Sequence, residues 1–405
     1  MGYVVSNEKF FAPIRDVVSM VKLKASYGLV GNDQIGGDRR FIYNETVIGG
    51  GKYYFGTTPS QYTSVRLGEF PNPNVGWEKA KKLNLGADLS FFNQLNISVD
   101  YFKENREGIF LQRKSIPMYV GLSTKPWVNI GKMRNSGIDA SLEYHQPLGK
   151  DLHLTVRGNF TYARNRIMDQ DEPDYAYTYM NHSGQMQWQK FGLVAAGLFQ
   201  DQEDIDSWAK QSFGEVKPGD IKYLDLNGDG IVDNYDTKPI GYSDIPEIVY
   251  GFGFSLQWKA FDLSAFFQGV AHVSFSTLTD QTQAFVGRNL KESSVFADLY
   301  GNTWTPENPG AKYPRMTTGA IDNNNQLSTF WMANGRYLRL KNLELGYTLP
   351  KRIANKIAMQ SLRVYLSGVN LFTFSPFKLW DPDLQTGATN YPNNRIINLG
   401  LTIGF

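Results

Sequence analysis

Apolar and polar residues alternate with a period of two along many long runs of this sequence. In the segment 95–101, for example, Leu, Ile, Val and Tyr residues alternate with Asn, Ser and Asp. The same pattern occurs in segments 21–27, 83–91, 138–144, 152–162, 250–258, 261–267, 338–347, 362–366 and 397–405. Successive side chains of a β-strand point to opposite faces, so each run has one apolar and one polar face. Because no helical segment lies between the runs to cover a parallel sheet, we expect roughly ten long antiparallel strands.

The connections between these runs alternate in length. Tight turns are expected at 92–94, 147–151 and 259–260, and segments rich in Gly, Asn and Pro span about 33–75, 112–128, 168–244, 278–328 and 376–390. Strands longer than about ten residues can cross a bilayer, whereas strands of a soluble sandwich average about five or six. The sequence therefore predicts an all-β, antiparallel transmembrane barrel with short periplasmic turns and long extracellular loops. A soluble β-sandwich is the alternative.

Composition excludes several other classes of protein. The chain has no cysteine, which excludes disulfide scaffolds, thiolate zinc sites and cysteine nucleophiles. Its 41 Lys+Arg and 39 Asp+Glu residues nearly cancel, so no broad basic field favours a nucleic-acid partner. Aromatic residues make up 14% of the chain, which suits a barrel that faces lipid. The sequence contains no apolar window of about 18 residues, so it predicts no transmembrane helix.

The last predicted strand, 397–405, finishes on an aromatic residue, Phe405, in phase with its four apolar residues. A terminal phenylalanine on an alternating strand resembles the signal by which outer-membrane barrels are recognised for assembly, so we predict that role for Phe405. A periplasmic C-terminus also places every short turn in the periplasm and every long loop outside the cell.

A series of short motifs occurs in the order and spacing of a known family. The motifs include KASYG at 24–28, WEK at 77–79, DLNGDG at 225–230, NTWTPENP at 302–309, YLRLKN at 337–342, LGYTLP at 345–350 and NLFT at 370–373. Each motif is weak singly, but the ordered set covers nearly the whole chain. It resembles the SusC/RagA family of TonB-linked outer-membrane transporters of Bacteroidetes-type bacteria.

The resemblance implies a barrel of about 22 strands with an N-terminal plug and a TonB box, which contacts the energy-coupling TonB complex. Such proteins import oligosaccharides or peptides, and a SusD-like surface lipoprotein forms a lid over the extracellular mouth. We expect residues 1–405 to be the C-terminal portion of such a barrel, about its last ten strands, with the plug, TonB box and signal peptide absent from it. The portion should form an open, curved sheet whose first and last strands are not paired with each other.

Residues 225–236, within the predicted extracellular loop 168–244, match a twelve-residue calcium loop. The matching ligand positions are occupied by Asp225, Asn227, Asp229, Ile231 (through its carbonyl), Asp233 and Asp236. Gly230 stands where such a loop turns sharply. We expect a structural Ca²⁺ site that orders this loop, although the flanks do not predict the helix pair of an EF-hand. The alternative is a cluster of turns with solvated acids.

Four tryptophans in or beside the predicted external loops are candidate substrate contacts. They are Trp188, Trp208, Trp304 and Trp380. Flat aromatic faces stack on sugar rings, and neighbouring polar side chains bind hydroxyl groups. The alternative is that these rings belong to the aromatic girdles of the barrel.

Catalytic constellations are weak in this sequence. A lipid-hydrolysing barrel would need a Ser–His pair on its outer wall, and among the 4 histidines only His272, with Ser274 or Ser276, is a near candidate for such a pair. We therefore predict no enzyme, and expect a TonB-energised nutrient importer of the cell outer membrane. The alternatives are a soluble secreted carbohydrate-binding β-protein and an outer-membrane barrel enzyme. The sequence does not distinguish glycans from peptides as the solute.

Overall fold

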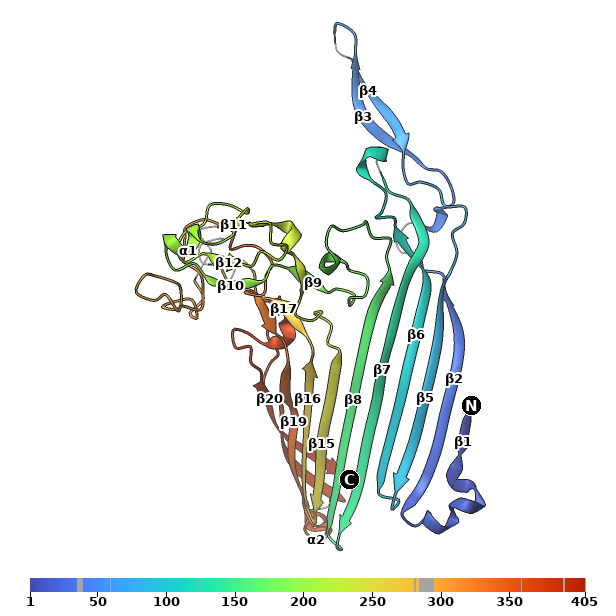
Figure 1. The fold of residues 1–405 in the computed structure, drawn as a ribbon. Coiled ribbons are helices and arrows are strands. Elements are labelled where there is room, and N and C mark those ends of the chain that lie inside the picture. Colours follow the sequence, from blue (N-terminus) through green and yellow to red (C-terminus); the bar gives the residue numbers. More distant parts are fainter. Residues whose placement is uncertain are drawn as a thin grey trace.

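The computed structural model describes residues 1–34, 39–58, 60–122, 124–279, 282–283, 295–357, 359–388 and 390–404. Its main element is an antiparallel sheet of eleven strands, curved like a section of a cylinder (Figure 1). In spatial order, which is also chain order, the strands are β1 (Gly2–Val4), β2 (Val18–Asn32), β5 (Glu78–Phe91), β6 (Leu95–Gln112), β7 (Trp127–Leu148), β8 (Leu152–Asp169), β15 (Ile248–Trp258), β16 (Phe261–Ala271), β19 (Tyr337–Thr348), β20 (Ser361–Phe374) and β21 (Ile396–Gly404). The predicted meander of long strands is confirmed.

Short turns join the strands at one end of the sheet, as the sequence predicts. Between β5 and β6, Phe92 and Asn93 have φ angles of 54° and 53°, the left-handed conformation that suits a tight hairpin. Residues 149–151 join β7 to β8, and Lys259 and Ala260 join β15 to β16. The connection from β19 to β20 is longer and contains α2 (Lys351–Ala354).

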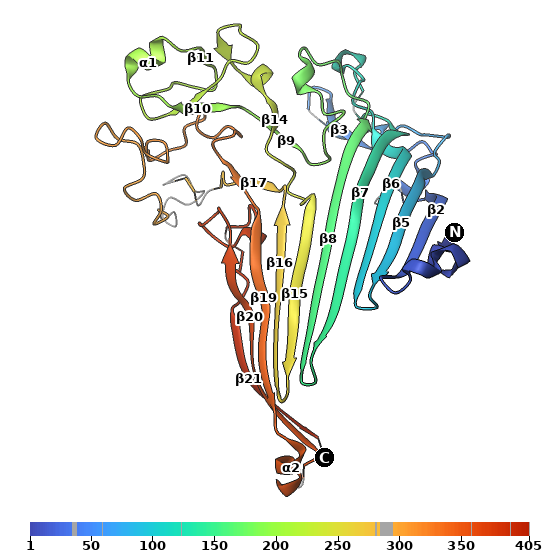
Figure 2. The same cartoon turned by 60° about the horizontal axis from the view of Figure 1, so that its bottom comes forward.

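The long connections lie at the other end of the sheet (Figure 2). They follow β2, β6, β8, β16 and β20, which matches the predicted loops. A hairpin of β3 (Val47–Phe55) and β4 (Ser60–Leu67) projects from the first of them. The other short elements are β9 (Lys190–Gly192), β10 (Ala195–Leu198), α1 (Gln202–Asp206), β11 (Lys210–Gln211), β12 (Ile221–Tyr223), β13 (Ile231–Val232), β14 (Lys238–Ile240), β17 (Ser274–Ser276) and β18 (Met332–Asn334).

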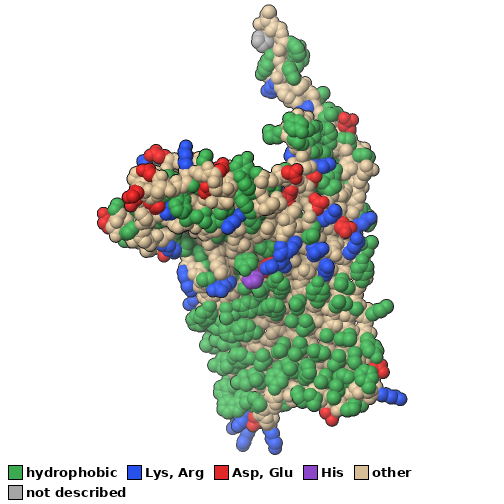
Figure 3. Space-filling view, in the orientation of Figure 1, with side chains coloured by type: hydrophobic (Ala, Val, Ile, Leu, Met, Phe, Trp, Pro, Cys, Tyr) green, Lys and Arg blue, Asp and Glu red, His purple; other side chains and the backbone are tan. Residues whose placement is uncertain are grey.

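Apolar side chains form a broad band on the outer face of the sheet (Figure 3). The register places Phe252 of β15 opposite Phe267 of β16, and the two rings stack with centroids 5.1 Å apart. On β21, Leu399 is 79% exposed. An exposed apolar surface of this extent is unfavourable in water and favourable against lipid. The outer face therefore has the character of a membrane-facing barrel wall.

The sheet is open within the part of the chain that the structure describes. Its order begins at β1 and ends at β21, and no pairing joins these two strands there. The expected open, curved sheet is therefore what the structure has. Across the described residues, no helix has both the length and the apolar character needed to cross a membrane.

Candidate functional site

The inner face of the sheet carries ion pairs between neighbouring strands. On β2, the Lys24 ammonium lies 2.7 Å from Asp88 Oδ1 of β5 and 3.0 Å from Asp100 Oδ2 of β6. The Ser98 hydroxyl also donates to Asp88 Oδ1, at 2.7 Å. These side chains lie over Gly86, where a Cβ would collide with the Asp100 carboxylate. The network makes this part of the inner wall polar and keeps its charges close to the backbone.

A second network of the same kind joins β16, β19 and β20. The Arg363 guanidinium donates to Asp262, and it donates to Glu344 Oε1 at 2.6 Å. It lies over Gly346, where a Cβ would collide with both the guanidinium and the Asp262 carboxylate. Both networks are partly exposed to solvent, so they form a hydrophilic lining.

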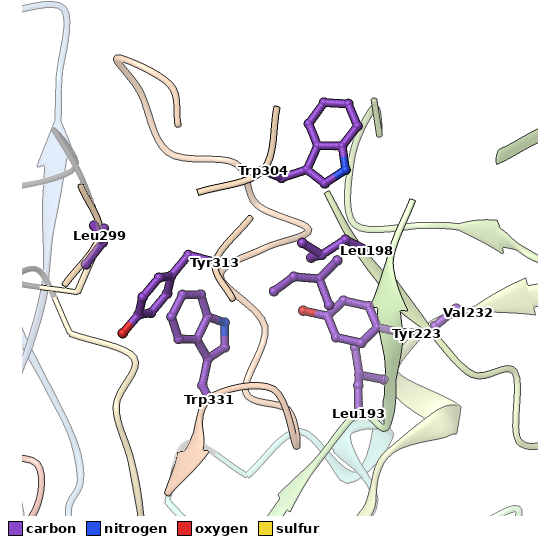
Figure 4. Packing of buried hydrophobic residues seen from close by; sticks show 9 residues of the cluster. Leu193, Leu198, Tyr223, Val232, Leu299, Trp304, Tyr313 and Trp331 are labelled. Atoms are coloured by element: carbon purple, nitrogen blue, oxygen red, sulfur yellow. The ribbon is translucent and has the colours of Figure 1, made fainter. Parts of the chain in front are cut away.

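Two long loops fold together into a compact body, which we call the loop unit and define as the described residues of 170–247 and 272–336. Its core consists of Leu193, Leu198, Ile221, Tyr223, Val232, Leu299, Trp304, Tyr313 and Trp331 (Figure 4). The first five belong to the loop after β8 and the last four to the loop after β16. Because both loops contribute to one core, they are ordered together.

A buried carboxylate joins the same two loops. Asp220 is fully buried, and its Oδ1 lies 2.8 Å from Arg315 Nε and accepts a hydrogen bond of 2.9 Å from Asn324 Nδ2. The Arg315 backbone N–H also donates to the Gly219 carbonyl at 2.9 Å. A buried charge is tolerated only when it is paired and hydrogen bonded in this way. Asp220 and Arg315 therefore hold the loop unit in one arrangement.

A cavity of about 540 Å³ lies between the loop unit and the loop after β20. Its lining includes the aromatic residues Phe296, Phe330 and Phe377 and the charged residues Asp298 and Lys312. Ligand sites are typically apolar clefts of about this size with a few polar groups that fix the orientation of the ligand. The cavity is therefore the strongest candidate solute contact among the described residues.

Two of the charged residues that line the cavity, Asp298 and Lys312, form a tight set with Tyr313. Lys312 Nζ lies 2.5 Å from Asp298 Oδ2, and the Tyr313 hydroxyl donates to the same oxygen at 2.6 Å. Hydrogen bonds from Lys312 and Tyr313 lower the pKa of Asp298. Burial, together with the hydrogen bond to Asp298, raises the pKa of Tyr313. At neutral pH this set therefore presents a carboxylate, an ammonium and a neutral phenol to the cavity, which Lys378 lines as well.

The predicted calcium loop is ordered by its own hydrogen bonds. Asp225 Oδ1 and Oδ2 accept the N–H groups of Gly228 and Gly230 at 2.7 and 2.8 Å. Asp236 is fully buried and accepts the N–H of Leu226 at 2.7 Å. Among the described residues, no three His, Cys, Asp or Glu side chains are grouped to hold a metal ion. The Ca²⁺ site formed by Asp225, Asn227, Asp229, Ile231, Asp233 and Asp236 stays a prediction.

The four candidate tryptophans have different surroundings. Trp188 has a mostly exposed ring, at 60%. Trp208 and Trp380 are partly buried, and their indole N–H groups donate to the carbonyls of Tyr223 and Gln385, both at 2.7 Å. Trp304 is buried in the core of the loop unit, so a contact between its ring and a solute would require that core to open. Substrate contact stays a prediction for all four.

In the described structure His272 contacts a carboxylate and a tyrosine ring. Its Nδ1 lies 3.1 Å from Glu247 Oε2, and its ring stacks on Tyr242 with centroids 4.6 Å apart. The Ser274 hydroxyl oxygen instead accepts the Tyr242 N–H, and that of Ser276 accepts the Leu278 N–H. The predicted assembly signal, Phe405, lies outside the described residues.

The protein family is decided by a match to residues 47–371, which fit the family model described as TonB dependent receptor-like, beta-barrel. The chain belongs to this family. The resemblance to SusC/RagA proteins is confirmed by named relatives. TonB-dependent receptor P3 of Formosa agariphila is 29% identical over 100% of this chain and 41% of its own length. TonB-dependent receptor SusC of Bacteroides thetaiotaomicron is 26% identical over 100% of this chain and 39% of its own length.

Solved structures agree with this assignment. The RagAB peptide transporter matches with a TM-score of 0.72 at 22% identity, over 100% of this chain and 43% of that chain. The 'closed-closed' state of the RagAB peptide importer matches with a TM-score of 0.73 at 23% identity, over 100% of this chain and 43% of that chain. The sheet is thus part of a transmembrane β-barrel wall with periplasmic turns and extracellular loops. The chain spans about two fifths of the length of the curated relatives it matches.

Sequence reasoning missed the features that depend on contacts between distant segments. These are the shared core of the loop unit, the Asp220–Arg315 pair and the aromatic cavity. No local signal marks them, because Asp220 and Arg315 lie in different loops. The inner-face networks do have a signal, since their charged residues stand at polar positions of the alternation.

Proposed function

We propose that residues 1–405 form part of the wall and the extracellular mouth of a TonB-energised importer in the outer membrane of a Bacteroidetes-type bacterium. The solute is an oligosaccharide or a peptide, and it passes without covalent chemistry. The observation that carries this proposal is the combination of a polar inner wall with an aromatic cavity at its loop end. The exposed apolar band disfavours the soluble alternative, since it would aggregate in water.

In this proposal each part of the chain has a different role. The cavity contacts the solute through Phe296, Phe330 and Phe377, whose flat faces suit sugar rings or apolar peptide side chains. The Asp298–Lys312 pair offers an acceptor and donors for polar groups of the solute. The ion pairs on the inner wall line the path. A SusD-like lipoprotein covers the mouth, and a plug coupled to TonB supplies the energy, as the family resemblance implies.

The experiment compares two phenylalanine substitutions in cells that carry the protein. Phe377→Ala removes an aromatic wall of the cavity, whereas Phe372→Ala removes a ring from the outer face of β20, opposite Leu340. Uptake of a fluorescent oligosaccharide and of a fluorescent peptide is measured with and without a protonophore, which removes the energy that TonB uses. Outer-membrane levels of both variants are measured alongside.

We expect Phe377→Ala to lower the uptake of one solute class severalfold, while Phe372→Ala has the uptake of the parent. The affected class identifies the solute as a glycan or a peptide. The protonophore should stop uptake in every variant. Uptake that continues in the presence of the protonophore would overturn the TonB-energised mechanism, and equal uptake by the two variants at equal protein levels would remove the cavity from the solute path.

A further inference from the structure

Lys and Arg side chains gather directly above the apolar band on the outer face of the barrel wall (Figure 3). Five of them stand on strands β5 to β8, and we call them the basic belt. They are Lys81, Lys103, Arg134, Arg164 and Arg166. The belt lies on the extracellular side of the band, because the long loops follow these strands at that end.

The strand register fixes the place of the belt relative to the lipid-facing band. Three consecutive outward rows run across β5, β6, β7 and β8 in that order. The rows are Leu85, Tyr101, Ile138 and Tyr162; then Leu83, Lys103, Ser136 and Arg164; then Lys81, Asn105, Arg134 and Arg166. The first row ends the apolar band, and the next two contain five cations and no acid. Each row is two residues further along its strands, which is about 7 Å.

Only part of this positive charge is neutralised by carboxylates. Lys81 lies 3.2 Å from Glu107, with both side chains about half exposed, and Arg164 is paired with the buried Glu247. In the described ranges, Lys103, Arg134 and Arg166 form no ion pair with a carboxylate. Arg134 donates to the amide oxygen of Asn105 at 3.1 Å, and Arg166 donates to the Gly184 carbonyl. Three cations are therefore left facing outward without an anion.

The opposite edge of the band has no such charge on the same strands. There the last outward row that crosses all four strands consists of Phe91, Leu95, Tyr144 and Val156. The two outward rows beyond it, on β7 and β8, are Gln146 with Leu154 and Leu148 with Leu152, and the cation that follows, Lys150, stands in the turn. A general need for polar residues beside a membrane would apply to both edges. The difference points to a ligand at the long-loop edge of the band.

We propose that the basic belt binds the phosphate groups of an anionic lipid in the outer leaflet. Cations one or two rows above the hydrocarbon stand at the depth of lipid headgroups, where each Lys or Arg strengthens attachment to anionic lipid. Arginine adds two parallel N–H donors that fit phosphate oxygens. The lipid chains of the same molecule would lie against the apolar band directly below, so one ligand satisfies both surfaces.

The test uses the protein extracted from outer membranes into detergent. In one variant, Lys103→Gln, Arg134→Gln and Arg166→Gln are combined, which removes the unpaired charge. A second variant combines Lys103→Arg, Arg134→Lys and Arg166→Lys, which keeps it. A third combines Lys150→Gln, Lys351→Gln and Arg352→Gln, which removes as much charge from the periplasmic end. Binding of phosphatidylglycerol, phosphatidylcholine and inorganic phosphate is measured by native mass spectrometry.

We expect the parent protein to bind phosphatidylglycerol more tightly than phosphatidylcholine. The first variant should weaken phosphatidylglycerol binding by about fivefold for each charge removed, of the order of 100-fold in total. The third variant should bind like the parent, and the second should keep most of the parental binding because it keeps the charge. Added salt should weaken parental binding. The proposal is overturned if the first variant binds phosphatidylglycerol like the parent, or if the third variant loses as much binding as the first. It is also overturned if phosphatidylcholine or free inorganic phosphate binds as tightly as phosphatidylglycerol.

Discussion

Asp171 fastens two extracellular loops together just beyond the end of β8. Its carboxylate accepts hydrogen bonds from the Arg113 side chain at 3.1 and 3.2 Å, from the backbone N–H groups of Lys114 and Ser115 at 2.8 and 3.1 Å, and from the Ser115 hydroxyl at 2.9 Å. The Asp171 side chain is only 11% exposed. This set, which we call the Asp171 clasp, joins the loop after β6 to the loop after β8.

The stability of the clasp depends on pH through the pKa of Asp171. Partial burial by itself would raise the pKa of Asp171, but the hydrogen bonds from Arg113, Ser115 and Lys114 outweigh it and lower the pKa from 3.8 to about 2. The folded pKa is therefore below the unfolded one, so the stabilisation is complete above about pH 5 and is lost as the pH falls from about 4 to about 2. At about 1.4 kcal/mol per pKa unit, the ionised carboxylate stabilises the clasp by about 2.4 kcal/mol at neutral pH.

Asp171→Asn removes this charge with little change in shape. Hydrogen exchange of the Lys114 and Ser115 amides measures how often the clasp opens. At pH 6 we expect their exchange to be about 60-fold faster in Asp171→Asn than in the parent, the factor that corresponds to about 2.4 kcal/mol. At pH 3 about half of the free-energy difference between the parent and Asp171→Asn should be gone. At that pH the parental carboxyl is mostly protonated in the open state and mostly ionised in the closed state.

The control is Asp174→Asn, which removes an exposed acid from the same loop. Its exchange at Lys114 and Ser115 should equal that of the parent. The reasoning is refuted if Asp171→Asn exchanges at the parental rate at pH 6, or if Asp174→Asn is accelerated as much. A difference between parent and Asp171→Asn that stays constant down to pH 2 would refute the assignment of the pKa shift to this carboxyl group.

Replacing both Asp225 and Asp229 with Ala should raise protease sensitivity near residues 220–240 in calcium; identical cleavage of the parent in calcium and in chelator would contradict the calcium site. Asp220→Ala leaves Arg315 without its carboxylate and should destabilise the loop unit by about 3 kcal/mol, seen as earlier proteolysis of the loop unit while the strands stay protected. Deleting Phe405 should lower outer-membrane levels, and unchanged levels would count against an assembly signal. Residues 1–405 expressed alone should give no heat-resistant monomer in detergent, because within the described residues no strand pairs with the outer edge of β21.

The long strands could be predicted because their signal is local. In β5 and β6 the alternation of apolar and polar residues tells which side chains point outward and which point inward. The two faces of these strands can therefore be predicted from the sequence alone. The tight turn at Phe92 and Asn93 is fixed by the short distance between the two runs. The five long connections could be predicted for the same reason, because they are the segments that lie between the alternating runs.

The interior of the loop unit could not be predicted in this way. Ile221 and Tyr223 stand in a short segment with no extended alternation, and they are buried by Trp304 and Trp331 from another loop. Trp304 illustrates the consequence. As a loop tryptophan it is an attractive substrate contact, yet the partner loop buries it, and only the pairing of the two loops could have shown this.

Glycines inside the strands of the inner wall indicate where another group packs closely against the wall. Glycine inside a strand weakens the strand and often marks the close approach of another group. At Gly86 and Gly346 the approaching groups are the charged side chains of neighbouring strands, which lie where a Cβ would be. Lys24 and Arg363 can therefore pair with their carboxylates close to the backbone of the wall. A glycine in phase with the polar face of a long strand thus predicts a charge network packed onto the wall, and this links the alternation of the sequence to the polar inner surface of the sheet.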